Sequence, residues 1–430
     1  MPHQFKETTR TGYGKRIIGS IKGILAGLIL FIGSFALLFW NEGRVDVSEF
    51  AEDAVIISAT EVTGTEPDQE LVSVNGIVNT QEQLGDGLYL KPGDYLALKR
   101  EVEIYAWTEQ SKSTTETKLG GAEETETTYT YIKEWVSEPT PTGNFRYPED
   151  HENPAKYIED VTETVNTAKI GVYDLDMDNI SLPGFEKLSL NEDIVELPES
   201  GIVKDSGDDA HEGFTVAEEE EEISTGFVVT EEELEGSDTN SEKEEVILDE
   251  KSEGPVLIGN YIYIGGGSLS RPEIGDMRIS YHVLENNKEV TVLGKLDGMK
   301  ISTYVDEETG ESLYRMFTGT KDQAVSQLHG EYKFALWMFR LIGFLMMWIG
   351  LSALFGPISV LLDVVPFFGS LSRTIIGAIT FVVALVLSGV TILVSMILHN
   401  IIALIAAVVL TVVIIFLILR VKGKKGKVKV

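Results

Sequence analysis

Long apolar segments near both ends of the chain predict where it meets a membrane. Residues 17–40, 334–355, 375–398 and 401–419 are almost entirely apolar. Each segment is close to the ~20 residues that a helix needs to cross about 30 Å of hydrocarbon. The pattern predicts four transmembrane helices, one amino-terminal and three carboxyl-terminal. A cleaved signal peptide is the alternative for 17–40, but that segment is too long for one and no small-x-small cleavage site follows it.

Between residues 41 and 333 the pattern changes to the period of two that is typical of strands. In the predicted strand 95–107, Val102, Ile104 and Ala106 alternate with polar neighbours, so one face of this strand is expected to be buried. β-branched and aromatic residues predict further strands at 54–62, 70–78, 125–136, 256–264, 277–284, 289–296 and 300–305. The expected fold class is an α+β membrane protein, in which the four helices carry a large β-rich extracytoplasmic domain.

Charge predicts the orientation of these elements. The net charge is −33, and the segments outside 41–333 carry +11, which leaves −44 for residues 41–333. Basic flanks favour the cytoplasmic side of a membrane. The basic amino terminus 1–16, the loop 356–374 and the basic tail 420–430 are therefore expected to be cytoplasmic. The domain 41–333 and the tight turn at 399–400 are expected to be extracytoplasmic or lumenal.

Small and charged residues in or beside the spans are candidates for helix packing and for function. Gly19, Gly23 and Gly27 recur at four-residue spacing, which allows close packing against another helix, although glycine is also simply frequent in membrane helices. Arg340 lies near the outer end of its span, from where its side chain can reach the interface.

Asp363 interrupts the otherwise apolar loop 356–374, which contains two prolines and is expected to form a short helix in the membrane interface. The Asp363 carboxylate would either cap a helix or pair with Arg373, or else act as a functional carboxylate at the membrane surface. The residues alone leave these alternatives open.

The sequence offers little for catalysis, cofactors or metal ions. It has no cysteine, its six histidines lack metal-binding spacing, and no G-x-S-x-G motif occurs. Residues 205–253 hold about twenty acidic side chains, which predicts a disordered insert within the β-rich domain. Weak cation binding is the alternative there, but no loop has the spacing of a calcium site. We therefore predict no catalytic, cofactor-binding or metal-binding residues, and no enzyme.

Short motifs that follow one another along the chain resemble a known family. They are Asn41-Glu42-Gly43-Arg44, the strand ending at Trp107, the Glu134-Trp135 pair, Asn153-Pro154, Gly275-Asp276, the membrane entry at Arg340, and Asp363. In this order they resemble the transmembrane protein 43 family, also called LUMA, over nearly the whole chain. The resemblance implies four spans, a lumenal or extracytoplasmic domain, self-association and association with other membrane proteins. Animal members occupy the endoplasmic reticulum and the inner nuclear membrane.

The predicted function is that of a non-enzymatic integral membrane scaffold, which self-associates and organises membrane protein complexes through its extracytoplasmic domain. The alternative is a channel or transport component whose acidic outer domain concentrates cations. The expected partners are membrane lipid, further copies of the chain and other membrane proteins, and no nucleic acid. As a multi-pass protein, it is expected in the plasma membrane of a prokaryote, or in the endoplasmic reticulum and inner nuclear membrane of a eukaryote.

Overall fold

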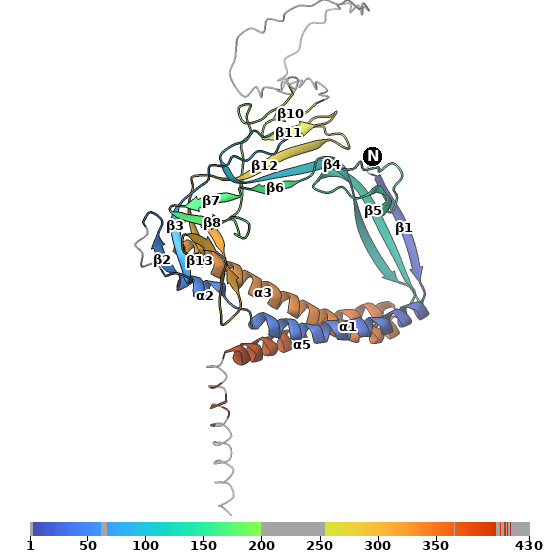
Figure 1. Cartoon of the computed structure of the whole chain (residues 1–430). Helices are drawn as coiled ribbons and strands as arrows, with labels where there is room; N and C mark the ends of the chain where they lie inside the picture. Colours follow the sequence, from blue (N-terminus) through green and yellow to red (C-terminus); the bar gives the residue numbers. More distant parts are fainter. Residues whose placement is uncertain are drawn as a thin grey trace, which may run out of the picture.

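Strands form a β body above a bundle of long helices in the computed structural model (Figure 1). The structure describes residues 3–61, 67–198, 254–364 and 366–400, and single positions between 405 and 413. The predicted span 401–419 is described only at those single positions. The tail 420–430 and the acidic insert 205–253 lie outside the described residues.

The bundle is built from three long helices, α1 (Tyr13–Glu42), α3 (Lys321–Leu354) and α5 (Pro366–His399), with the short α4 (Gly356–Leu362) between the last two. All three long helices contain stretches that are long and apolar enough to cross a membrane. They coincide with the predicted spans 17–40, 334–355 and 375–398 but extend beyond them. At residues 356–374, where a loop was predicted, the structure has α4 and the start of α5.

Helix α3 begins well before its apolar part because its first turns belong to the β body. Thr320 and Gln323 form a capping box, in which the Thr320 amide donates to Gln323 Oε1 at 3.0 Å. Ala324 and Leu328 are buried among the second sheet and the short helix α2 (Val47–Glu52). The same helix therefore leads from the β body into the bundle (Figure 1).

The first sheet has eight strands in the order β1-β5-β4-β12-β11-β10, with β6 paired to β4 and β9 paired to β12. Its long strands are β1 (His3–Thr11), β4 (Tyr95–Thr117), β5 (Glu123–Val136) and β12 (Met277–Glu285). The short ones are β6 (Val161–Thr164), β9 (Glu186–Lys187), β10 (Val256–Ile258) and β11 (Tyr261–Ile264). Val102, Ile104 and Ala106 are buried in this sheet, as their alternation predicts.

The second sheet has seven strands in the order β17-β13-β14-β8-β7-β3-β2, and β13 also pairs with β3. They are β2 (Val55–Ser58), β3 (Leu71–Asn79), β7 (Thr167–Ile170), β8 (Tyr173–Asp176), β13 (Glu289–Asp297), β14 (Lys300–Ser302) and β17 (Arg315–Thr318). Strands β15 (Tyr304–Val305) and β16 (Ser312–Leu313) form a separate pair, and Thr142–Asn144 is a 3₁₀ turn.

Residues 3–11 correct the predicted domain boundaries. The sequence suggested a basic segment 1–16 that is separate from the β-rich domain 41–333. Instead β1 pairs with β5 from His3 opposite Tyr131 to Thr11 opposite Glu123. Charge was a poor guide here because the strand is rich in threonine, which favours extended backbone. Gly12, in extended conformation, then leads directly into α1.

Helices α1 and α3 cross where Gly27 faces Gly350. A Cβ atom on Gly27 would lie 2.8 Å from Ala353 Cβ, and one on Gly350 would lie 2.7 Å from the Phe31 backbone nitrogen. Gly27 therefore allows the close packing that its spacing indicated. A Cβ on Gly19 or Gly23 would meet no described atom within 4 Å.

We expect Gly350→Ala to destabilise the bundle by about 1–3 kcal/mol, because the new Cβ would press on the α1 backbone and force the helices apart. The measurement is the thermal unfolding midpoint in detergent. Gly389→Ala in α5 is the matched control, since a Cβ there meets nothing within 4 Å. Equal midpoints for the two variants would contradict the close crossing.

Candidate functional site at the end of the helix bundle

The hairpin that joins β4 and β5 reaches the end of the bundle where α1 starts and α4 meets α5 (Figure 1). Arg16 Nη1 donates to the Gly121 carbonyl at 2.6 Å, and the Gly120 amide donates to the Val364 carbonyl at 3.1 Å. Gly120 and Gly121 have φ values of +86° and +78°, which a glycine adopts without strain. Tyr13 packs so closely on Gly121 that a Cβ there would clash with its ring.

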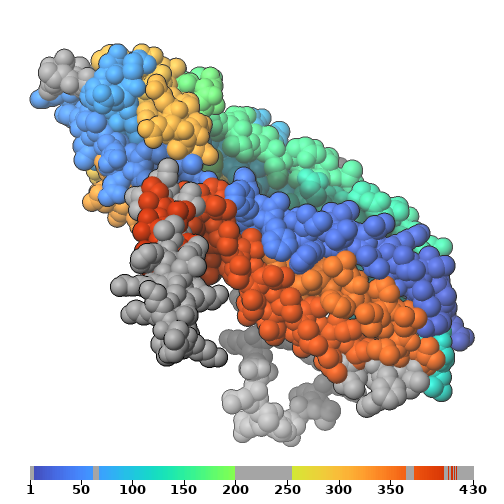
Figure 2. All heavy atoms as spheres, turned by 90° about the horizontal axis from the view of Figure 1, so that it is seen from below, coloured from blue at the N-terminus to red at the C-terminus, as the bar shows by residue number. Residues whose placement is uncertain are grey.

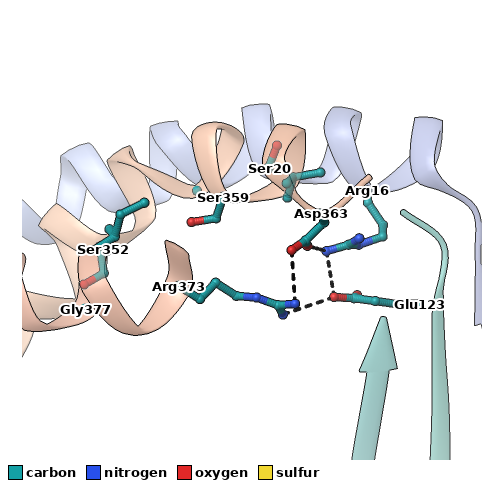
Figure 3. Close-up of a pocket in the computed structure, with 11 residues that line it drawn as sticks. Arg16, Ser20, Glu123, Ser352, Ser359, Asp363, Arg373 and Gly377 are labelled. Carbon is teal, nitrogen blue, oxygen red and sulfur yellow. Dashed lines mark hydrogen bonds and ion pairs between the residues drawn. The ribbon is translucent and has the colours of Figure 1, made fainter. Parts of the chain in front are cut away.

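Four charged side chains, which we call the charged junction, meet at this contact: Arg16, Glu123, Asp363 and Arg373 (Figure 3). Arg16 Nη2 pairs with Asp363 Oδ2 and lies 2.7 Å from Glu123 Oε1. Arg373 lies 3.3 Å from Asp363 Oδ1 and 3.4 Å from Glu123 Oε1. The arginines and carboxylates thus alternate around a closed ring.

The four members of the charged junction differ in how deeply their side chains are buried. The side chains of Asp363 and Arg16 are 0% and 6% exposed, whereas those of Glu123 and Arg373 are 22% and 44% exposed. A charge buried this deeply is tolerated only beside an opposite charge. Asp363 and Arg16 are therefore the deeply buried pair of the charged junction, and Arg16 also holds Glu123 of the hairpin.

A pocket of about 410 Å³ opens beside the charged junction, and its wall includes Ser20, Ser352, Ser359 and Gly377 (Figure 3). Ser352 and Thr380 hydroxyls lie 2.8 Å apart, and Thr380 also donates to the Ile376 carbonyl. Because the two arginines are balanced by two carboxylates, the ring carries no net formal charge. The arrangement is suited to holding the hairpin on the bundle rather than to moving protons or binding a strongly charged ion.

The sequence predicted part of this site. Pairing with Arg373 was one of the alternatives for Asp363, and the structure confirms it. Arg16 and Glu123 were missed, because Arg16 lies 347 residues from Asp363 and joins it only through the fold. A basic residue at the start of a predicted span looks like an ordinary cytoplasmic flank.

A second charged contact ties the other end of α1 to α3. Arg340 donates from Nε and Nη2 to the Glu42 carboxylate at 2.8 and 2.7 Å, and its guanidinium lies 4.8 Å from the Trp337 ring centre. Asn41 Nδ2 donates to the Leu336 carbonyl at 3.0 Å. The Arg340 side chain is thus engaged by Glu42 at the end of α1.

The glycine and arginine that follow in the same motif also lie at this end. A Cβ on Gly43 would lie 2.5 Å from His399 Nε2, so the glycine leaves room for the end of α5. Arg44 lies over the rings of Trp40 and Phe339, at 5.8 and 5.5 Å from their centres. The motif 41–44 is therefore a junction of three helices.

The remaining motif residues lie within the first sheet and its loops, away from both ends of the bundle. Asn153 Oδ1 accepts from the Trp107 amide at 2.7 Å, and Asn153 Nδ2 donates to the Trp107 carbonyl at 2.9 Å. Pro154 packs against Gly275. Arg278 lies over the Trp135 ring at 4.6 Å. These residues fix loops to strands.

Asp276 is buried just before the start of β12 and accepts hydrogen bonds there. The Glu273 amide donates to it at 2.6 Å and the Gly266 amide at 3.0 Å, and the Tyr263 hydroxyl is a third donor. This carboxylate therefore holds the loop between β11 and β12 in place.

A buried cluster of Asp86, Arg100 and Tyr281 had no sequence signal. Asp86 Oδ1 accepts from the amides of residues 88, 89 and 90, and Oδ2 accepts from Arg100 at 2.9 Å and from the Tyr281 hydroxyl at 2.5 Å. Burial raises the pKa of Asp86, but the hydrogen bonds from Tyr281, the amides and Arg100 together bring that pKa below its ordinary value. Burial and the bond to Asp86 raise the pKa of Tyr281.

Within the described ranges, no group of three histidine, aspartate or glutamate side chains is placed to hold a metal ion. The arrangement that is present, three long apolar helices attached to a β body, defines an integral membrane protein. The sequence matches the family model described as Transmembrane protein 43 over residues 104–401. The chain belongs to this family, which confirms the resemblance seen in its motifs.

Curated relatives cover most of the chain. It is 25% identical to human Transmembrane protein 43 over 403 residues, which is 89% of this chain and 86% of the human one. The mouse protein is 26% identical over 397 residues, covering 88% and 84% of the two chains. The Drosophila melanogaster homolog is 24% identical over 338 residues, covering 76% and 75%. No solved structure matches the chain.

Proposed function

We infer that this protein is a non-enzymatic membrane scaffold that associates with copies of itself and organises other membrane proteins around its β body. The observation that carries this proposal is that the motif residues make contacts between elements of the protein itself. Asn41, Arg340, Asn153 and Asp276 each hold two elements together by hydrogen bonds or an ion pair. Because these polar groups make contacts within the protein, they hold its elements in a rigid frame, as a scaffold requires.

The outer face of the bundle supports the membrane part of the proposal. Ile18, Leu25 and Ile29 of α1 are 60%, 67% and 72% exposed, on the side opposite the buried Gly27 and Leu38. A row of exposed large apolar side chains is stabilised by contact with lipid or with another apolar surface. A Cβ on Gly19 or Gly23 of the same helix would meet no described atom within 4 Å, which leaves room for a helix of a second copy to approach closely.

Cross-linking in native membranes, followed by mass measurement in detergent, tests the scaffold. We expect dimers or larger assemblies, and we expect Gly23→Leu to reduce them because its side chain would fill the open strip on α1. Gly389→Leu on α5 is the matched control and should leave the assemblies unchanged. A chain that cross-links only as a monomer and co-purifies with no other protein would overturn the proposal.

Flux measurements in liposomes separate this function from the cation channel considered above. Ser388 and Thr391 donate to carbonyls of their own helix, and Ser395 donates to the Phe39 carbonyl of α1. Ser388 and Thr391 are thus satisfied within α5, and Ser395 joins α5 to α1, so these hydroxyls are engaged by the protein rather than free to line a path for ions. We expect no cation leak above that of empty vesicles, and a leak that requires the protein would favour the channel.

A further inference from the structure

We propose that Arg44, the last residue of the motif 41–44, binds the phosphate group of a phospholipid whose acyl chains lie against the helix bundle. Arg44 follows the end of α1, where the chain passes from the bundle to the β body. The lipid is held at the headgroup level of the membrane, at the end of the bundle where α1 leads into α2. This site goes beyond the scaffold function, because it requires only that the helices are embedded in a membrane.

The side chain of Arg44 differs from its neighbours in the motif, because its donors are not used within the described part of the chain. Asn41 donates to the Leu336 carbonyl, and Glu42 accepts from Arg340. The Nη1 nitrogen of Arg44 is buried and has no hydrogen-bond partner among the described residues. A guanidinium carries five N–H donors, and a donor left unpaired away from water is costly. Arg44 therefore has donors to offer to a ligand.

The two carboxylates nearest to Arg44 along the chain are already engaged by other residues. Glu42 lies 2.7 Å from Arg340, and Asp46 lies 2.7 Å from His329 Nδ1. The charge of Arg44 is thus left for a partner from outside the described chain. Phosphate suits it, because the planar fork of a guanidinium matches two phosphate oxygens and is more weakly hydrated than an ammonium group.

Aromatic side chains place the Arg44 guanidinium at the level of the lipid headgroups. It lies 5.8 Å from the Trp40 ring centre and 5.5 Å from the Phe339 ring centre, and these two rings meet edge to face. Trp40 and Trp337 are 54% and 66% exposed at this end of α1 and α3. Tryptophan favours the boundary between hydrocarbon and water. The guanidinium therefore lies where the phosphate groups of phospholipids are found.

The outer face of the bundle offers the apolar surface that the acyl chains need. Seen from below in Figure 2, α1 in blue, α3 in orange and α5 in red-orange lie side by side, with the β body behind them. Phe39, Met338 and Leu398 are exposed at the same end of these three helices. A phospholipid can therefore combine charge-assisted hydrogen bonds at Arg44 with burial of its chains on the helices.

Native mass spectrometry of the whole protein in detergent, with increasing lipid concentration, measures the affinity of this site. We expect the parent protein to bind dioleoylphosphatidylcholine and dioleoylphosphatidylglycerol saturably, and R44Q to bind each about ten-fold more weakly, because a charge-assisted contact is lost. Dioleoylglycerol has the same acyl chains but no phosphate, and it should bind to both proteins equally weakly. K133Q is the matched control, since Lys133 Nζ also lies over a ring, 4.8 Å from the Trp107 centre, but in the first sheet. It should bind phospholipid as the parent does.

Equal phospholipid affinity of R44Q and the parent would overturn the proposal. Tight binding of inorganic phosphate that R44Q abolishes would also overturn it, because the ligand would then be a free anion. R44K keeps the charge but loses the fork, so it should bind phospholipid more weakly than the parent. If R44Q does not fold, R44K carries the comparison, and equal affinity then counts against the proposal. Lipid affinity is read on the single chain, so failure of the scaffold proposal is seen separately, in the cross-linking experiment.

Discussion

Replacing Asp363 with asparagine is expected to lower the free energy of unfolding by about 3 kcal/mol and to release the hairpin from the bundle. The change keeps the size of the side chain but removes its charge, so the buried Arg16 guanidinium is left with Glu123 as its charged partner. Breaking a buried ion pair costs about 3–5 kcal/mol. We expect the lower end of this energy range, because the Arg373 and Glu123 side chains keep partial contact with water.

Hydrogen exchange of residues 118–122, together with thermal unfolding in detergent, measures both parts of this expectation. The Gly120 amide donates to Val364 and should exchange much faster in D363N. E116Q is the control, since Glu116 pairs with Lys118 on the exposed strand surface, where such pairs contribute little to stability. Unchanged exchange at the hairpin tip in D363N would show that Asp363 is not needed to hold it.

Replacing Asp86 with asparagine is expected to have a comparable effect on the β body, with a loss of about 3–5 kcal/mol. The Arg100 side chain is 7% exposed and that of Asp86 is 0% exposed, so the arginine would be buried without its counter-charge. Y281F removes only the hydroxyl that donates to the same carboxylate and should cost about 1.5–3 kcal/mol, as is usual for a hydrogen bond to a charged group. The measurement is denaturant unfolding of the two variants and the parent.

The pH dependence of stability follows from the lowered pKa of Asp86. Because the folded pKa lies below the ordinary value of 3.8, the folded state holds this proton more weakly than the unfolded chain does. The stabilisation is complete above the unfolded pKa and disappears as the pH falls through the folded pKa. D86N should therefore flatten the acid limb of the stability curve below about pH 4. An unchanged acid limb would mean that other carboxylates govern it.

Charged contacts lie at both ends of α1. At its start, Arg16 pairs with Asp363 and with Glu123 of the β4–β5 hairpin, and at its end Glu42 pairs with Arg340 of α3. Both pairs are largely buried, so salt in the surrounding water screens them little. The first contact therefore joins the hairpin to the bundle, and the second joins two helices within the bundle.

The sequence by itself determined the apolar helices, most strands of the β body and the family. These features are local: twenty apolar residues, an alternation of period two and short motifs are each visible without knowledge of distant residues. The role of β1 was missed although its residues favour a strand, because an isolated polar strand is defined by its partner, and β5 lies more than a hundred residues away.

Only the tertiary structure decided which charged residues meet and how the helices are attached to the β body. Arg16 and Asp363 are 347 residues apart, and Asp86 and Tyr281 are 195 apart, so no spacing along the chain could reveal either contact. Arg16 is held in an ion pair and the residues before it form a strand, so contacts with distant residues, which no local charge pattern reveals, attach this segment to the first sheet.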